Sequence, residues 1–315
     1  MKVVIMAGGK GTRISSVASD IPKPMIKIEG KPVLEHELEC LRDQGFTDII
    51  ITVSHLGNII MEYFGDGSGT SPVTGKPFGV HIEYYFEKEP LGNAGALFKI
   101  KDNLTSDFLL LNADAVFDVD FNRFVGFHQE HAGMVTLFTH PNSHPYDSGL
   151  IIAGKNGVVE KWLAKEDERP QYYRNRVNAG LHVISPKVLK LVDIDADSIG
   201  KIGANGKPVK VDLDRQLLKP LAGTGKMFCY DSPEYVKDMG TPERYYSVCA
   251  DYKEGRVSGK NLKNKQKAVF LDRDGTINKY VGFLRNIDDF ELIDGVAEAV
   301  RKINESGYLA VVVTN

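Results

Sequence analysis

Cysteine and tryptophan are scarce in this 315-residue chain, which contains three Cys and one Trp. Cys40, Cys229 and Cys249 are odd in number and far apart, so the sequence predicts neither a disulfide framework nor a cysteine zinc site. Widely spaced thiols of this kind are typical of proteins from a reducing compartment. We therefore expect the protein to be cytoplasmic.

Long hydrophobic runs and a strong excess of one charge are also missing. No apolar stretch approaches the roughly 20 residues of a membrane-spanning helix, and the start MKVVIMAGG lacks the pattern of a signal peptide. The formal net charge is −3, which gives no general nucleic-acid-binding surface. We expect the partners to be small molecules, and we expect no binding to membranes or nucleic acids. The sequence leaves the oligomeric state open, and a homo-oligomer is one possibility.

Short apolar runs alternate with helical patterns along the first 250 residues. Strands are predicted at Val3–Met6, Asp48–Val53, Val80–Phe86 and Asp107–Leu111, and helices at Pro32–Gln44, Asn58–Phe64 and Ala94–Lys101. This alternation predicts an α/β fold, with a Rossmann-like, mostly parallel sheet flanked by helices. A ligand of such a sheet is expected at the carboxyl ends of its strands.

The length exceeds that of one ordinary compact domain. The polar, basic segment 254–266 has few hydrophobic residues and is interpreted as a linker, and a new strand begins at Ala268. We therefore predict a first domain over residues 1–253 and the first part of a second α/β domain over residues 267–315.

The loop MAGGKGTR directly follows the first predicted strand. Its glycines Gly8, Gly9 and Gly11 let backbone N–H groups approach an anion, and Arg13 can clamp phosphate oxygens. The pattern is neither a Walker loop nor a dinucleotide fingerprint, because Ile14 stands where the third glycine of the latter would be. A phosphate-binding loop is therefore favoured over a nicotinamide oxidoreductase, with a tight structural turn as the alternative.

A second basic residue follows in the segment DIPKPM. Lys23 lies between Pro22 and Pro24, which hold it in a stiff, extended stretch. A rigid lysine near a glycine-rich loop indicates an anionic ligand, whereas the alternative is a surface lysine in a proline-rich loop.

GGKGTR followed by IPKPM resembles the sugar-1-phosphate nucleotidyltransferases, the enzymes that make nucleotide sugars. The resemblance continues in order through EKEPLGNAGAL, LNADAVFD, EKW, NAG and KDMGTPERY, over roughly residues 1–250. The segment YDSGL at Tyr146–Leu150 departs from the common YGV form. The resemblance implies transfer of a nucleotidyl group from an NTP to a sugar 1-phosphate, with release of pyrophosphate and with Mg²⁺ as cofactor.

The resemblance also implies roles for individual residues. Arg13 would stabilise the departing pyrophosphate, Lys23 would neutralise the reacting phosphates, and Asp114 and Asp238 would hold Mg²⁺. Taken on its own, without the resemblance, Asp114 is better interpreted as a residue that caps a turn after its strand. The implied NTP-binding residues are Gly8, Gly9, Gly11, Thr12, Glu87, Gly92 and Asn93. The implied sugar-phosphate-binding residues are Gly149, Glu160, Lys161 and Asn178.

Glu87 bears on the choice of base. An ionised carboxylate only accepts hydrogen bonds, and guanine offers adjacent N1–H and N2–H₂ donors on one edge. This favours GTP, with a solvated residue at a strand end as the alternative.

The stretch KAVFLDRDGTIN contains Asp272 and Asp274, two residues apart on an extended segment. Asp-x-Asp-Gly-Thr resembles the first motif of haloacid-dehalogenase-like phosphatases, especially the branch of heptose-bisphosphate and histidinol phosphatases. The resemblance implies a nucleophile at Asp272, an acid/base at Asp274, and a phosphate contact from Thr314. The alternative is an Asp pair that only forms a turn. We expect this phosphatase part to be truncated and inactive.

The two resemblances together suggest consecutive steps on one sugar. A heptose-bisphosphate phosphatase would leave a heptose 1-phosphate, which a nucleotidyltransferase can use. We therefore expect a guanylyltransferase acting on D-glycero-D-manno-heptose 1-phosphate, with mannose 1-phosphate as the alternative acceptor. A hypothesis of another class is a non-catalytic nucleotide-sugar-binding regulatory protein, which predicts loss of the charged residues that this sequence retains.

Overall fold

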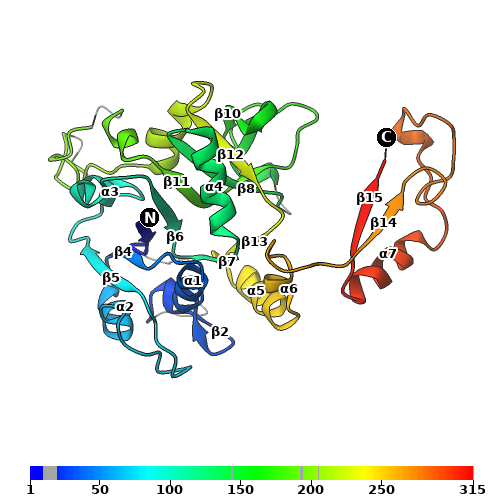
Figure 1. The fold of residues 1–315 in the computed structure, drawn as a ribbon. Coiled ribbons are helices and arrows are strands. Elements are labelled where there is room, and N and C mark those ends of the chain that lie inside the picture. The colour runs from blue at the N-terminus through cyan, green and yellow to red at the C-terminus, as the bar shows by residue number, and fades with distance from the viewer. Residues whose placement is uncertain (10–19, 143–144, 192–193, 205, 315) are drawn as a thin grey trace. The chain divides into compact units, whose positions relative to one another are not determined.

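The computed structural model describes residues 1–9, 20–142, 145–191, 194–204 and 206–314. For Asp147 it describes the backbone and not the side chain. The chain divides into two compact units, Met1–Asn261 and Leu262–Asn315 (Figure 1). The division falls inside the segment that we interpret as a linker. Its first half folds onto the first unit, because Val257 of helix α6 (Arg256–Gly259) is buried and the Asn261 amide donates to Asp118 Oδ1 (2.6 Å).

One sheet of the first unit contains nine strands among the described residues, and most of them follow one path. The order along this path is β10 (Val159–Leu163), β9 (Leu150–Ala153), β11 (Val177–Ile184), β6 (Phe108–Asn112), β1 (Val3–Met6), β4 (Asp48–Val53) and β5 (His81–Phe86). Strand β8 (Val135–His140) pairs with β11 and with β12 (Met227–Asp231). Strands β6, β1, β4 and β5 are parallel neighbours, while β11 is antiparallel to β6. The predicted α/β fold with a mostly parallel central sheet is confirmed.

The strands are buried on both faces, so successive residues enter two different hydrophobic clusters. Val3 and Ile5 of β1 pack with helices α1 (Val33–Arg42), α2 (Gly57–Phe64) and α4 (Phe121–His131). Val4 instead packs with α3 (Gly95–Lys99), the 3₁₀ segment η6 (Pro186–Lys190) and the π-helical segment η7 (Leu213–Leu218). This period-two division explains the continuous apolar runs in the sequence.

A small second sheet brings two distant parts of the chain together. Strand β7 (Ala115–Asp118) pairs in antiparallel fashion with β13 (Tyr235–Asp238), which α5 (Pro242–Lys253) follows. A third apolar cluster joins this sheet and α5 to the hairpin of β2 (Lys27–Ile28) and β3 (Lys31–Pro32). The short 3₁₀ turns of the unit are η2 (Lys23–Met25), η3 (Lys101–Asn103), η4 (Pro145–Asp147), η5 (Lys155–Gly157) and η8 (Lys219–Leu221).

The second unit contains β14 (Ala268–Asp272), η9 (Ile287–Asp289), α7 (Val296–Glu305) and β15 (Leu309–Val313). The two strands are parallel, with Asp272 opposite Val313. None of the ten residues of α7 is buried, and large apolar side chains such as Phe270 and Ile287 are exposed. Among the described residues of both units, no helix has the length and apolar character needed to cross a bilayer.

Candidate active site

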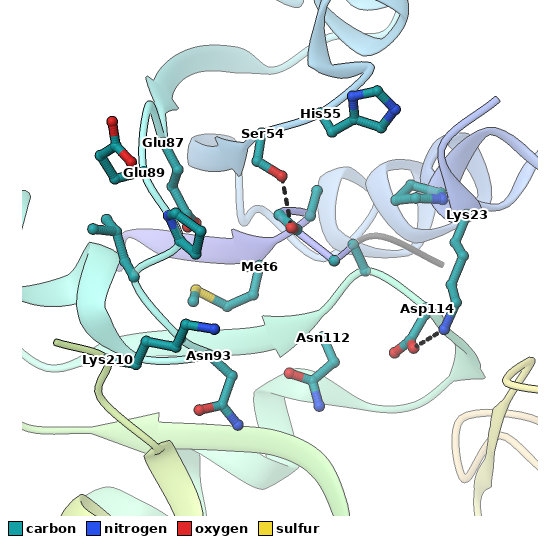
Figure 2. A pocket seen from close by; sticks show the side chains of 18 of the residues that line it. Met6, Lys23, Ser54, His55, Glu87, Glu89, Asn93, Asn112, Asp114 and Lys210 are labelled. Atoms are coloured by element: carbon teal, nitrogen blue, oxygen red, sulfur yellow. Dashed lines mark hydrogen bonds and ion pairs between the residues drawn. The ribbon is translucent and has the colours of Figure 1, made fainter. Parts of the chain in front are cut away.

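A cavity of about 740 Å³ lies at the carboxyl ends of the parallel strands (Figure 2). Each strand ends directly before residues that line it: Gly8 and Gly9 after β1, Ser54 and His55 after β4, Glu87 after β5, and Ala113 and Asp114 after β6. This is the position expected for the ligand of an open α/β sheet. We call it the first cavity.

Lys23 and Asp114 meet at one side of the first cavity. Lys23 Nζ donates to Asp114 Oδ2 at 3.0 Å (Figure 2). The lysine lies in η2, and the buried side chains of Pro24 and Met25 fix this turn against the core. Asp114 Oδ1 has no protein partner in the described part of the chain and is available to a ligand.

Gly8 and Glu87 form the closest contact on the β1 side of the cavity. A Cβ atom on Gly8 would lie 2.7 Å from Glu87 Oε1, so a side chain at position 8 would require the Glu87 carboxyl group to shift. The Glu87 side chain is 9% exposed and is hydrogen-bonded by the Thr52 hydroxyl and the Leu91 backbone. Burial raises the pKa of Glu87 to about 7 despite these bonds. The carboxyl group therefore has protein partners already, which the predicted base-reading role did not anticipate.

The loop after Glu87 is attached to a segment more than a hundred residues away. Leu91 O accepts from Val211 N (2.9 Å), and Asn93 Oδ1 accepts from Leu213 N (2.8 Å). Gly92 has φ +84°, and a Cβ there would lie 2.3 Å from Val211 O. The loop and the segment thus form one wall of the first cavity.

Lys210 belongs to this wall and was not predicted as a site residue. Figure 2 shows its side chain reaching into the first cavity from the side of Asn93. Its surrounding sequence, GKPVKVD, carries no recognisable motif, so its position follows only from the attachment of residues 211–213 to the loop.

A second unpredicted residue is Glu37, on α1. It is 1% exposed, and neither carboxylate oxygen has a hydrogen-bond partner in the described structure. Burial, and secondarily the negative charge of Asp114, raises the pKa of Glu37 well above its usual value. A buried acid without a hydrogen-bond partner in the described structure therefore lies close enough to Asp114 to feel its charge.

The small β7–β13 sheet brings the backbone of Asp238 close to that of Asp114. Met239 N donates to Asp114 O (3.0 Å), and Asp238 is opposite Ala115 in the β13–β7 register. The Asp238 carboxylate faces a second cavity of about 780 Å³, where Arg244 Nη1 lies 2.7 Å from both of its oxygens. The structure brings the two predicted aspartates together along the backbone, and each is paired with a cation.

The predicted sugar-phosphate residues are distributed unevenly. Asn178 lines the second cavity with Asp238, whereas Glu160 and Lys161 are exposed on β10 and do not line either cavity. A local contact explains the glycine at position 149, because a Cβ there would lie 3.0 Å from Trp162 Nε1. The predicted residues Gly11, Thr12 and Arg13 lie outside the described residues.

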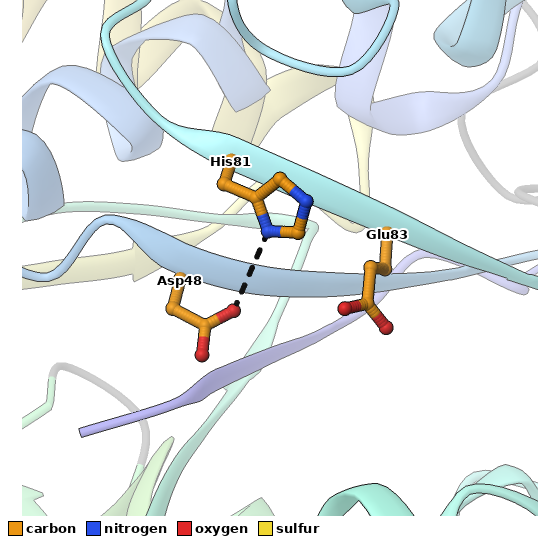
Figure 3. A group of neighbouring side chains, drawn as sticks. All are labelled: Asp48, His81 and Glu83. Carbon is orange, nitrogen blue, oxygen red and sulfur yellow. Dashed lines mark ion pairs between the residues drawn. The ribbon is translucent and has the colours of Figure 1, made fainter.

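Another group of polar side chains lies at the opposite edge of the sheet, where β4 and β5 begin. Asp48, His81 and Glu83 have possible metal-ligand atoms within 4.8 Å of one another (Figure 3). All three are at least partly exposed, and Lys2 Nζ lies 3.3 Å from Asp48 and 3.9 Å from Glu83. This lysine already balances the carboxylates, so we assign no metal here.

In the second unit, the parallel register places the carboxyl ends of β14 and β15 together, which brings Asp272 beside the strand end that precedes Thr314. Arg273 donates from Nε and Nη2 to the Asp274 carboxylate at 3.0 and 2.9 Å. These bonds lower the pKa of Asp274 below its usual value.

Comparison with known proteins identifies the first unit. HddC from Yersinia pseudotuberculosis is 26% identical, with a TM-score of 0.61 over 80% of this chain and 99% of that protein; a second structure of HddC is complexed with GMP-PN. The mannose-1-phosphate guanyltransferase of Saccharomyces cerevisiae is 29% identical over 252 residues. These cover 78% of this chain, which spans 63% of the length of that relative. A family model described as Nucleotidyl transferase matches residues 2–255, and the chain belongs to that family.

Proposed function

We propose that the first unit transfers a guanylyl group from GTP to a sugar 1-phosphate and releases pyrophosphate. The observation that carries this proposal is the Lys23–Asp114 pair in the first cavity, at the carboxyl ends of the parallel strands. Membership of the Nucleotidyl transferase family supports the reaction class.

In this reaction an oxygen of the sugar 1-phosphate attacks the α-phosphorus of GTP, and the bond from that phosphorus to pyrophosphate breaks. Catalysis of such a step depends on positioning and on charge stabilisation. Lys23 would exchange its contact with Asp114 for the reacting phosphates, and the N–H groups around Gly8 and Gly9 would approach the triphosphate. Arg13 stays a proposal for the departing pyrophosphate.

The carboxylates fit a magnesium ion that is shared with substrate phosphates. Asp114 Oδ1 has no partner in the described structure, and Asp238 follows on the paired strand. Mg²⁺ prefers one or two carboxylates plus phosphate oxygens, and when bound it would neutralise charge that develops on the phosphates. Arg244 must leave Asp238 for that carboxylate to serve as a ligand.

The choice of GTP is supported by the names of the relatives and by the GMP-PN complex of HddC. For the acceptor we propose D-glycero-D-manno-heptose 1-phosphate, because the second unit resembles a heptose-bisphosphate phosphatase. Mannose 1-phosphate is the second candidate, because the S. cerevisiae relative carries that name.

Pyrophosphate release by the purified chain tests the proposal. GTP, ATP, UTP, CTP and dTTP are each combined with heptose, mannose and glucose 1-phosphates in the presence of Mg²⁺. The expected result is turnover with GTP and the highest kcat/KM for the heptose phosphate. A higher kcat/KM for mannose 1-phosphate would replace the acceptor, and absence of turnover with every pair would contradict the reaction itself.

For the second unit we propose the first two motifs of a haloacid-dehalogenase-like phosphatase that is inactive in this chain. Asp272 is exposed, and the Arg273 guanidinium is committed to Asp274. The expected outcome is no phosphate release from a sugar bisphosphate. Release that is abolished by Asp272→Asn would contradict the proposed inactivity.

A further inference from the structure

Strand β11 is irregular at the point where it lines the second cavity. Asn178 is opposite Thr139 of β8, but His182 is opposite Leu137, so four residues of β11 advance against two of β8. Gly180, with φ +77°, lies inside this bulge. In a regular strand, residues four apart are separated by about 13 Å, whereas here the side chains of Asn178 and His182 meet.

The Asn178 amide oxygen accepts two hydrogen bonds in this bulge. Gly180 N donates to Asn178 Oδ1 (3.2 Å), and His182 Nε2 lies 3.0 Å from the same atom. A backbone N–H can only donate, so the shared atom must be the oxygen. Since an amide oxygen only accepts, His182 must carry its proton on Nε2.

This arrangement leaves the Asn178 NH₂ group for a ligand. Asn178 lines the second cavity, and its Nδ2 has no protein partner in the described structure. The ring of His182 is 1% exposed, with Nδ1 unpartnered. Burial lowers the pKa of His182 to about 3, so the ring stays neutral and keeps its single N–H donor.

We propose that His182 is a positioning residue for the acceptor substrate: with Gly180 N–H, it orients Asn178 so that the amide NH₂ donates to an oxygen of the sugar 1-phosphate in the second cavity. This rests on the proposed transferase function. His182 does not line either cavity itself, so it acts only through Asn178.

Steady-state kinetics of the full chain test the assignment, with GTP and the best sugar 1-phosphate each varied in turn. His182→Phe keeps a planar aromatic ring but removes the donor, and we expect KM for the sugar 1-phosphate to rise about tenfold while KM for GTP changes less than about twofold. His182→Gln, which restores an N–H donor, should recover most of the acceptor affinity.

His128 provides a matched control, because it is also buried but bonds to Thr136 and Asp107, away from both cavities. His128→Phe should lower Tm without raising either KM. An unchanged acceptor KM in His182→Phe, or an equal rise for both substrates, would overturn the proposal. Absence of turnover in the unmodified chain would instead contradict the transferase function.

A measurement without substitution covers the case in which the variants do not fold. Long-range ¹H–¹⁵N spectra of the ¹⁵N-histidine-labelled chain report which ring nitrogen of His182 is protonated. The Nε2–H tautomer is expected, and an Nδ1–H tautomer would overturn the assignment independently of any activity.

Discussion

Two buried glutamates, Glu87 in the lining of the first cavity and Glu37 on α1, oppose folding when they ionise. Glu37 lacks any hydrogen-bond partner in the described structure, and Glu87 is only 9% exposed. In both, burial disfavours the charged form and raises the pKa. The folded protein stabilises such groups as neutral acids, so the free energy of unfolding falls when they ionise.

The pH dependence of stability follows from Glu87. Its folded pKa of about 7 lies above the ordinary value of 4.5, so its contribution is complete below pH 4.5 and is lost as the pH rises through 7. This gap corresponds to roughly 3 kcal/mol. We expect Glu87→Gln to flatten the decline in unfolding free energy between pH 5 and 8, measured by urea denaturation. The exposed Glu62→Gln is the control, and a slope unchanged by Glu87→Gln would contradict the assignment.

Lys23 and Asp114 should affect turnover more than stability. Lys23→Ala removes the charge that we propose for the reacting phosphates, and Asp114→Asn removes the negative charge of the carboxylate that pairs with Lys23. For each we expect kcat to fall by a factor on the order of 10²–10³, the typical cost of losing one transition-state contact. Circular dichroism should report a retained fold, and Lys27→Ala, an exposed lysine on β2, should keep kcat. Full activity in either site variant would remove that residue from the proposed site.

Among the elements, the loop from Glu87 to Asn93 depends on one close backbone approach. Gly92→Ala must strain φ and also displace Val211 O, whereas Gly30 has a similar φ of +82° and open space around it. We expect Gly92→Ala to destabilise the protein by about 1–3 kcal/mol more than Gly30→Ala. Because Gly92 lines the first cavity, KM for GTP should rise only in Gly92→Ala. Equal effects of the two substitutions on stability and KM would show that the close approach is unimportant.

The elements that the sequence predicted best are the buried strands and their flanking helices. Val3–Met6 and Asp48–Val53 match β1 and β4 residue for residue, because their short length and their β-branched residues favour a strand over a buried helix. Helix α4 was not predicted, although Asp120 caps it by accepting from Arg123 N. Strand β7 has only four residues and is stabilised by pairing with β13, more than a hundred residues later, which no local pattern contains.

For the whole first unit, the sequence indicated which residues converge but not their contacts. The resemblance suggested that Asp114 and Asp238 act together, and the β7–β13 pairing supplies their proximity. Nothing in the local sequence indicated that Arg244 would bind Asp238, that Lys210 would enter the first cavity, or that His182 would hold Asn178. These contacts depend on tertiary folding and on a bulge, and neither has a periodic signature.

The division of the chain predicts that the first unit functions alone. Residues Met1–Asn261 contain both cavities and all three apolar clusters. A protein ending at Asn261 should therefore keep the kcat and Tm of the transferase unit. It should also be more soluble, because Phe283 and Ile287 of the second unit are 89% and 87% exposed. A large loss of kcat on removing residues 262–315 would contradict this independence.

The bulge of β11 has a consequence for how the binding of one substrate affects the other. On one side, Gly180 lies so close to Asn112 that a Cβ would be 2.5 Å from its Nδ2, and Asn112 lines the first cavity. On the other side, Gly180 N holds Asn178 in the second cavity. We therefore expect a nucleotide that shifts Asn112 to change the position of the Asn178 amide as well. Thermodynamic linkage then requires that each substrate change the affinity for the other by the same factor, so one short kink in the backbone can couple the two binding events whichever substrate arrives first.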